Sequence, residues 1–142
     1  MNQEKGPIRV LIAIPGFDGH WKGAMTVTMA LRDAGAEVIY AGTQTPRSIA
    51  EIAIQEDVDV IGLSIFSGGY MKLIPQTIDA LHAKKADDIL VILGGIIPPD
   101  DIPKLKELGV DEIFLPGGKT QDITDYVNEN AGLKRKHHSI TG

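Results

Sequence analysis

The sequence contains no cysteine among its 142 residues. This absence excludes a disulfide framework, a thiolate zinc site, an iron–sulfur cluster and a cysteine nucleophile. Basic residues are also in the minority, with 14 Lys and Arg against 19 Asp and Glu and a net charge of −5. Such a balance argues against nucleic-acid binding, which usually needs a concentrated basic face. No apolar run approaches the roughly 20 residues of a membrane span, so we expect no membrane association.

The N-terminal segment 1–5 lacks the apolar core of a signal peptide, which indicates a cytoplasmic protein. Hydrophobic residues make up 43% of the chain and charged residues 23%, a balance typical of a folded domain. We expect one domain over residues 6–131, followed by a polar, flexible tail over 132–142. Two histidines in that tail, His137 and His138, are expected to be solvated rather than metal ligands.

Five apolar runs, each nearly continuous and rich in Val, Ile and Leu, alternate with segments of helical period. Continuous runs are typical of strands that are covered on both faces. The pattern predicts an α/β fold, a flavodoxin-like (Rossmann-like), doubly wound parallel sheet of five strands in the order 2-1-3-4-5. The predicted strands are 8–14, 37–40, 58–63, 89–93 and 112–115, and the predicted helices are about 24–34, 46–54, 71–85, 100–108 and 121–130.

The loops after four of these strands, 15–23, 64–69, 94–99 and 116–120, are rich in glycine. Ligands of such sheets bind beyond the carboxyl ends of the strands, and glycine lets the backbone approach a ligand closely. In the first loop, the Asp18 carboxylate can accept a hydrogen bond from one ring nitrogen of His20 and leave the other as an oriented base. One histidine cannot hold zinc alone, but it suffices for a metal that arrives inside a macrocycle.

Each of these features also has a purely structural interpretation. The Asp18–His20 pair can be a hydrogen-bonded turn, Ser64 a helix cap, and Gly94-Gly95 a tight turn between strand and helix. The sequence Gly-Gly-Lys-Thr of 117–120 lacks the preceding Gly-x-x-x-x spacing of a phosphate loop, so that function is rejected.

Three motifs together resemble those of cobalamin-binding domains. Residues 18–23, Asp-Gly-His-Trp-Lys-Gly, are similar to the Asp-x-His-x-x-Gly signature of that family. Its companion motifs, Ser-x-Leu and Gly-Gly, correspond to Ser64-Ile65-Phe66 and Gly94-Gly95 after the third and fourth predicted strands. Over about residues 6–130 the chain resembles the separately encoded small subunit of methylmalonyl-CoA mutase and related acyl-CoA mutases.

The resemblance implies that His20 is the lower axial ligand of cobalt, in place of the cofactor's dimethylbenzimidazole base, and that Asp18 orients it. These two residues carry the implied catalytic and metal-binding roles. Ser64 would hydrogen-bond the displaced base, and Gly94 and Gly95 would give the nucleotide tail room. The implied cofactor-binding residues are Gly16, Phe17, Asp18, Gly19, His20, Trp21, Gly23, Ser64, Phe66, Ser67, Gly68, Gly94, Gly95, Gly117 and Gly118.

Two positions depart from the family pattern. Phe66 replaces the leucine of the third-strand motif, which should reshape the tail pocket. Ile14 stands where such mutases usually carry a lysine that pairs with the aspartate, so the tuning of cobalt through His20 should differ. Together with Trp21, this departure slightly favours a substrate other than methylmalonyl-CoA.

The implied function is that of the cobalamin subunit of a heteromeric, adenosylcobalamin-dependent acyl-CoA mutase, an isomerase that rearranges a carbon skeleton by radical chemistry. Methylmalonyl-CoA and 2-hydroxyisobutyryl-CoA are candidate substrates. Because a TIM barrel needs about 250 residues, a large TIM-barrel subunit must bind the acyl-CoA, and this chain alone should be inactive. A G-protein chaperone is a further candidate partner. The exposed interface is expected around Phe17, Trp21 and residues 68–70.

Two alternatives from other classes are weaker. A corrinoid carrier for methyl transfer would use the same histidine, but such carriers commonly have a helical bundle before the cobalamin domain. Only seven residues precede the first predicted strand. A phosphorylation receiver needs acidic residues after the first strand and an aspartate after the third, where this chain has Ile14 and Ser64.

Overall fold

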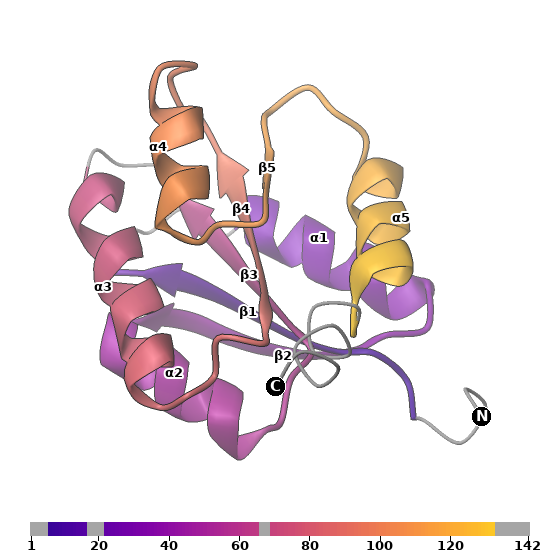
Figure 1. Cartoon of the computed structure of the whole chain (residues 1–142). Coiled ribbons are helices and arrows are strands. Elements are labelled where there is room, and N and C mark those ends of the chain that lie inside the picture. The colour runs from indigo at the N-terminus through magenta and orange to yellow at the C-terminus, as the bar shows by residue number, and fades with distance from the viewer. Residues whose placement is uncertain (1–5, 17–21, 66–68, 133–142) are drawn as a thin grey trace.

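The computed structural model describes residues 6–16, 22–65 and 69–132. Strands and helices alternate along the chain, as the apolar runs predict (Figure 1). The elements are β1 Arg9–Pro15, α1 Lys22–Asp33, β2 Glu37–Gln44, α2 Pro46–Gln55, β3 Val60–Ile65, α3 Tyr70–Ala83, β4 Leu90–Gly95, α4 Asp101–Leu108, β5 Glu112–Phe114 and α5 Thr120–Asn130. None of the helices in these ranges is both long and apolar enough to cross a membrane.

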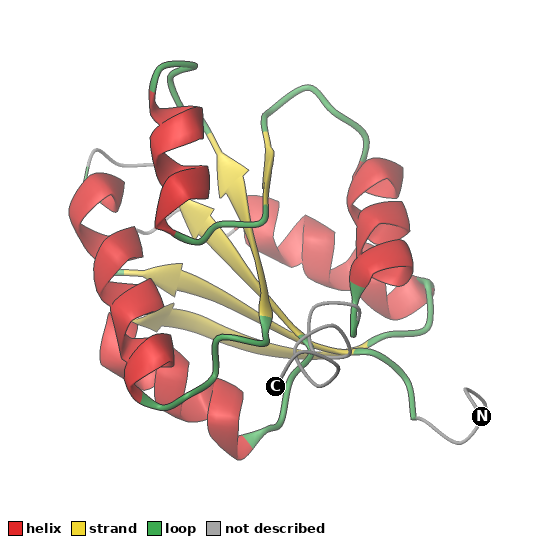
Figure 2. Ribbon diagram, viewed as in Figure 1, coloured by secondary structure: helices red, strands yellow, loops and turns green. Residues whose placement is uncertain are grey.

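The five strands form one parallel sheet in the order β2-β1-β3-β4-β5, which confirms the predicted topology. Helices α1 and α5 cover one face of this sheet, and α2, α3 and α4 cover the other (Figure 2). Because every strand is parallel, all carboxyl ends meet at one edge. The glycine-rich loops predicted to bind a ligand therefore lie at that edge.

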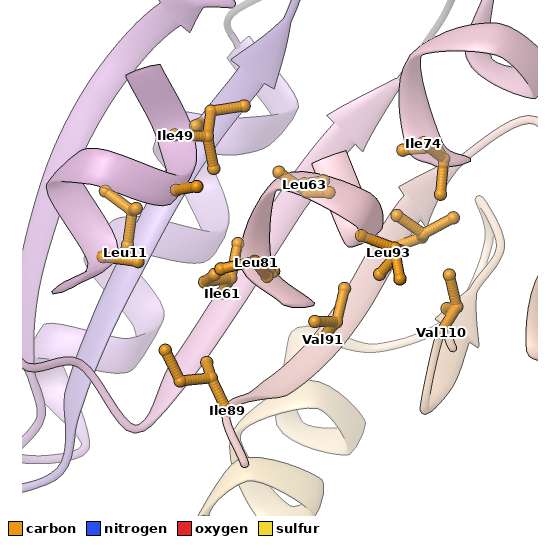
Figure 3. Close-up of a cluster of buried hydrophobic side chains, with 14 of the residues drawn as sticks. Leu11, Ile49, Ile61, Leu63, Ile74, Leu81, Ile89, Val91, Leu93 and Val110 are labelled. Atoms are coloured by element: carbon orange, nitrogen blue, oxygen red, sulfur yellow. The ribbon is translucent and has the colours of Figure 1, made fainter. Parts of the chain in front are cut away.

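The strands separate two apolar cores by the alternation of their side chains. In β1, Leu11 and Ala13 point toward α2, α3 and α4, whereas Val10 and Ile12 point toward α1 and α5. The first and larger core contains residues of the strands and of α2, α3 and α4. Figure 3 shows part of it, including Leu63, Leu93 and Ile74. A sheet covered on both faces explains why the strands are almost continuously apolar.

Local signals in the sequence set most helix ends. Thr45 caps α2, because its hydroxyl accepts a hydrogen bond from the Ser48 N–H at 3.1 Å. Gly35 and Gly109 follow α1 and α4 with φ of 99° and 122°, a region that favours glycine. Helix α3 begins at Tyr70, which places Pro75 inside the helix rather than in its first turn.

Strand ends are less well predicted than helix ends. The second strand extends to Gln44 rather than ending at residue 40, and the fourth extends to Gly95. The extra residues of β2 pair with β1 beyond a bulge, and those of β4 pair with β3. Backbone pairing across the sheet, rather than side-chain hydrophobicity, keeps these polar and glycine-containing segments extended.

Candidate functional site

A cavity of about 660 Å³ lies between the sheet and helices α1 and α5. Its walls come from β1, β3 and β4, from the segment that joins β5 to α5, and from the first turns of α1 and α5. Cavities of roughly 300–1,000 Å³ are typical of sites for small-molecule ligands. The site is at the carboxyl edge of the sheet, where the fold predicts it.

The cavity exists because β3 and β4 have small residues on this face. Gly62, Ser64 and Gly94 line it. Leu63 and Leu93, the residues before Ser64 and Gly94, also border it, but their side chains belong to the opposite core. Alternation along a strand lets one face be filled while the other stays hollow. The same strands therefore support the protein's main core and leave room for a ligand.

Gly94 and Gly95 of β4, both predicted to bind the cofactor, are glycines for different physical reasons. A Cβ on Gly95 would lie 1.9 Å from the Ile65 carbonyl oxygen, and the φ of Gly95 is +151°. A side chain there is incompatible with the pairing of β3 and β4. Among the residues that the structure describes, the heavy atom nearest to a Cβ on Gly94 would be the Phe114 carbonyl oxygen, at 3.9 Å. Glycine at position 94 is therefore needed for space in the cavity, not for the backbone.

The cavity is apolar at its buried end and polar at its exposed end. Ile12 and Ile92 are each only 3% exposed and form part of its lining. Lys119 and Asp122, at the start of α5, are exposed. Half-buried Ser64 lies on the wall, and its hydroxyl makes no hydrogen bond to the part of the chain that the structure describes. Such a cavity suits a flat, largely apolar ring attached to a polar or charged chain.

The structure brings six of the predicted cofactor-binding residues together around the cavity: Gly23, Ser64, Gly94, Gly95, Gly117 and Gly118. Gly16 does not line it. A Cβ on Gly16, whose φ is +87°, would meet Leu73 Cδ1 of α3 at 2.9 Å. The remaining predicted residues lie outside the described ranges and stay predictions: Phe17, Asp18, Gly19, His20, Trp21, Phe66, Ser67 and Gly68.

Sequence reasoning missed several residues of the cavity. Gly62 is the most informative, because a Cβ there would lie 2.7 Å from Ile12 Cδ1. Its position two residues before Ser64, on the same strand face, is a signal that could have identified it. Val27 and Ile123, on α1 and α5, were missed because helical periodicity identifies them only as core residues.

Two structural interpretations of the motifs are wrong. Ser64 is not a helix cap, since it lies within β3 and the N-cap residue of α3 is Gly69. Gly94 and Gly95 do not form a tight turn to the next helix, because they pair with β3 and α4 begins only at Asp101.

The unusual residue Ile14 is 1% exposed and packs in the core beneath α1 and α5. A charged lysine at this position would need a partner to offset its loss of hydration. Burial in the core therefore explains why an apolar residue, Ile14, stands at this position.

Tyr70 does not provide the exposed interface expected of it. It is 8% exposed, and its hydroxyl donates a hydrogen bond to Asp101 Oδ2 at 2.5 Å, which joins the first turns of α3 and α4. Lys104 Nζ lies 3.9 Å from the other oxygen of Asp101. Burial of the ring and the bond to a carboxylate make Tyr70 part of the fold at this edge.

The hydrogen bond to Asp101, reinforced by burial and by the negative charge of Asp101, raises the pKa of Tyr70 to about 12. Unfolded tyrosine has a pKa of about 10, so the folded state holds this proton more tightly. The resulting stabilisation is complete below about pH 10 and is lost as the pH rises to about 12. The free energy of unfolding can be measured with urea at about pH 9 and at about pH 11. Its decrease between these two pH values should be smaller in Tyr70→Phe than in the wild type. Equal losses would contradict this role.

Comparisons with known proteins identify the family. Residues 8–123 match the model of the B12 binding domain. The chain is 43% identical over 125 residues to the 2-hydroxyisobutanoyl-CoA mutase small subunit of Aquincola tertiaricarbonis, covering 87% of this chain and 92% of that protein. It is 38% identical over 122 residues to the pivalyl-CoA mutase small subunit of Xanthobacter autotrophicus, covering 85% and 82%.

A methylmalonyl-CoA mutase of Escherichia coli is 39% identical over 131 residues, which cover 92% of this chain but only 18% of that enzyme. Among solved structures, a cobalamin-binding protein from Desulfitobacterium hafniense superposes with a TM-score of 0.75 at 20% identity, covering 86% of this chain and 58% of that one. The last likeness concerns the fold alone. From the family match and the small-subunit relatives it follows that this chain belongs to the B12-binding domain family, whose ligand is cobalamin.

Proposed function

We propose that this chain is the cobalamin-binding small subunit of a heteromeric acyl-CoA mutase. The observation that carries the proposal is the glycine-lined cavity between the sheet and helices α1 and α5, whose lining includes Gly23, the last residue of the motif at residues 18–23. Relatives that match over most of their length are small subunits of mutases, which favours this function over methyl transfer.

The cavity fits the nucleotide tail of cobalamin. Its apolar end, lined by Ile12 and Ile92, would hold the benzimidazole ring. The Ser64 hydroxyl would donate a hydrogen bond to a ring nitrogen, and Gly94 would let the tail pass the sheet. The phosphate of the tail would approach the start of α5, where backbone N–H groups of a helix favour an anion.

With its own base held in the cavity, the cofactor needs another lower ligand. We propose that His20 supplies this ligand and that Asp18 accepts a hydrogen bond from its second ring nitrogen, which raises its donor strength. Adenosylcobalamin, when bound, supplies the radical chemistry of the rearrangement. This chain binds the cofactor and orients the histidine, while a large subunit binds the acyl-CoA. The relatives named above support an isomerase, and 2-hydroxyisobutyryl-CoA is a candidate substrate.

Electron paramagnetic resonance of the purified chain with cob(II)alamin tests this proposal. With unlabelled protein, we expect each superhyperfine line to be a triplet, from one axial nitrogen-14. With nitrogen-15 histidine, the triplet should become a doublet, because the ligand is then a labelled protein imidazole. A triplet in both samples would mean that cobalamin keeps its own base, and failure to retain the cofactor would contradict the whole proposal.

A further inference from the structure

The buried end of the cavity is a row of residues that lie side by side on neighbouring strands. Ile12 of β1 pairs with Gly62 of β3, and Gly62 pairs in turn with Ile92 of β4. All three residues line the cavity, and the two isoleucines are each 3% exposed. Paired residues of parallel strands that face the same side of a sheet are direct neighbours. Ile12, Gly62 and Ile92 therefore form one apolar surface, which we call the cavity floor.

Ile12 has a large side chain on one flank and none on the other. Its partner on β2 is Tyr40, which packs against the same core, whereas its partner on β3 is Gly62. An ideal Cβ at residue 62 would lie 2.7 Å from Ile12 Cδ1 and 3.7 Å from Ile92 Cγ1. Carbon atoms in contact lie about 3.5–4.0 Å apart. The end of the Ile12 side chain therefore lies over Gly62, in space that a side chain at residue 62 would need.

A methyl group at residue 62 would displace the Ile12 side chain rather than the backbone. The atom that it would meet is a terminal methyl group, which can rotate between staggered positions. Tyr40 occupies the flank toward β2, so the remaining direction is away from the sheet, toward α1 and α5. The cavity lies in that direction. Alanine at residue 62 would thus raise the cavity floor by moving Ile12 into the cavity.

We infer that Gly62 is a positioning residue for the Ile12 side chain, and that the cavity floor determines how large a base the cavity accepts. This inference rests on the proposed function, because it takes the base of the nucleotide tail as the occupant. With glycine at residue 62, Ile12 lies along the sheet and the cavity keeps its depth. Apolar pockets discriminate by roughly 10- to 200-fold between ligands that differ by one methylene group. One methyl group added to the cavity floor should affect a flat aromatic base to a comparable extent.

A double-mutant cycle on the whole chain tests the positioning role. Cobalamin dissociation constants are measured for the wild type, Gly62→Ala, Ile12→Val and the double variant. Gly62→Ala should weaken binding about tenfold. Valine lacks Cδ1, so Ile12→Val removes the atom that the added methyl group would displace. In the Ile12→Val background, Gly62→Ala should therefore change affinity by less than about twofold.

Ile61→Val is the matched control for Ile12→Val. Ile61 lies next to Gly62 on β3, but its side chain is buried in the opposite core. Combined with Gly62→Ala, this substitution should leave the loss of cobalamin affinity in place. Restoration of binding by Ile61→Val as well as by Ile12→Val would contradict a specific contact between Gly62 and Ile12.

Two further corrinoids test whether the cavity floor acts on the base. Cobinamide, which lacks the nucleotide tail, should bind equally well to the wild type and to Gly62→Ala. A corrinoid whose base is benzimidazole without the two methyl groups should lose less affinity than cobalamin, because a smaller base tolerates a higher floor. Equal losses for all three corrinoids, no loss for cobalamin, or a loss that Ile12→Val does not reverse would overturn the inference.

Circular dichroism and the thermal midpoint establish whether each variant is folded. If Gly62→Ala alone does not fold, the double variant should still fold and bind cobalamin, because the atom that overlaps with the added methyl group is absent. An unfolded double variant would also overturn the inference. Failure of the wild type to bind cobalamin would instead refute the proposed function.

Discussion

Gly94→Leu is expected to weaken cobalamin binding about 100-fold while the protein remains folded. Within the described part of the chain, a Cβ at residue 94 has no heavy atom nearer than 3.9 Å, so the substitution should cause little strain. The added side chain would instead fill part of the cavity of about 660 Å³ and compete with the nucleotide tail. Gly95 cannot serve for this test, because its substitution would disrupt the sheet.

Cobinamide provides the decisive comparison, because it has the corrin ring but lacks the nucleotide tail. Its dissociation constant should be nearly the same for the wild type and for Gly94→Leu. Gly6→Leu is the matched control, since no heavy atom of residues 6–16, 22–65 or 69–132 lies within 4 Å of its ideal Cβ and Gly6 does not line the cavity. Equal losses of affinity for cobalamin and cobinamide would show that the cavity does not hold the tail.

His20→Ala is expected to reduce cobalamin affinity by about 100-fold or more and to abolish the nitrogen-15 effect in the paramagnetic spectrum. The reason is that cobalt would lose its protein ligand while the rest of the site remained. Asp18→Asn should reduce cobalamin affinity less, by about tenfold, because it weakens the orientation and basicity of the imidazole without removing it.

His82→Ala is the control for these two variants. His82 is exposed in the last turn of α3, on the face of the sheet opposite the cavity. Binding and spectrum should match those of the wild type. Unchanged affinity in both His20→Ala and Asp18→Asn would refute the assignment of the ligand loop.

Local and periodic signals determined the architecture. Apolar runs located all five strands, and the doubly wound order followed from the alternation of strands and helices. Thr45 and Gly109 marked helix ends through capping chemistry that acts within a few residues. Such short-range signals can be recognised in a single sequence because they require no partner far away in the chain.

Motif spacing also determined a large part of the candidate site. Ser64, Gly94 and the glycines at 117 and 118 were predicted from loop position and resemblance, and all line one cavity. Parallel strands bring their carboxyl ends together whatever the sequence separation, so predicting the strands placed these residues at one edge. The roles of Asp18 and His20 remain predictions.

Only the tertiary structure decided how the site is built. That residue 62 is glycine depends on Ile12 of a neighbouring strand, and that residue 95 is glycine depends on the carbonyl oxygen of Ile65. Tyr70 became a buried link rather than an exposed interface because Asp101, 31 residues away, provides its acceptor. The bulge that brings Gln44 to Gly16 arises from the pairing of β2 with β1. Each of these features depends on distances between residues far apart in the chain, which packing sets and which sequence spacing does not encode.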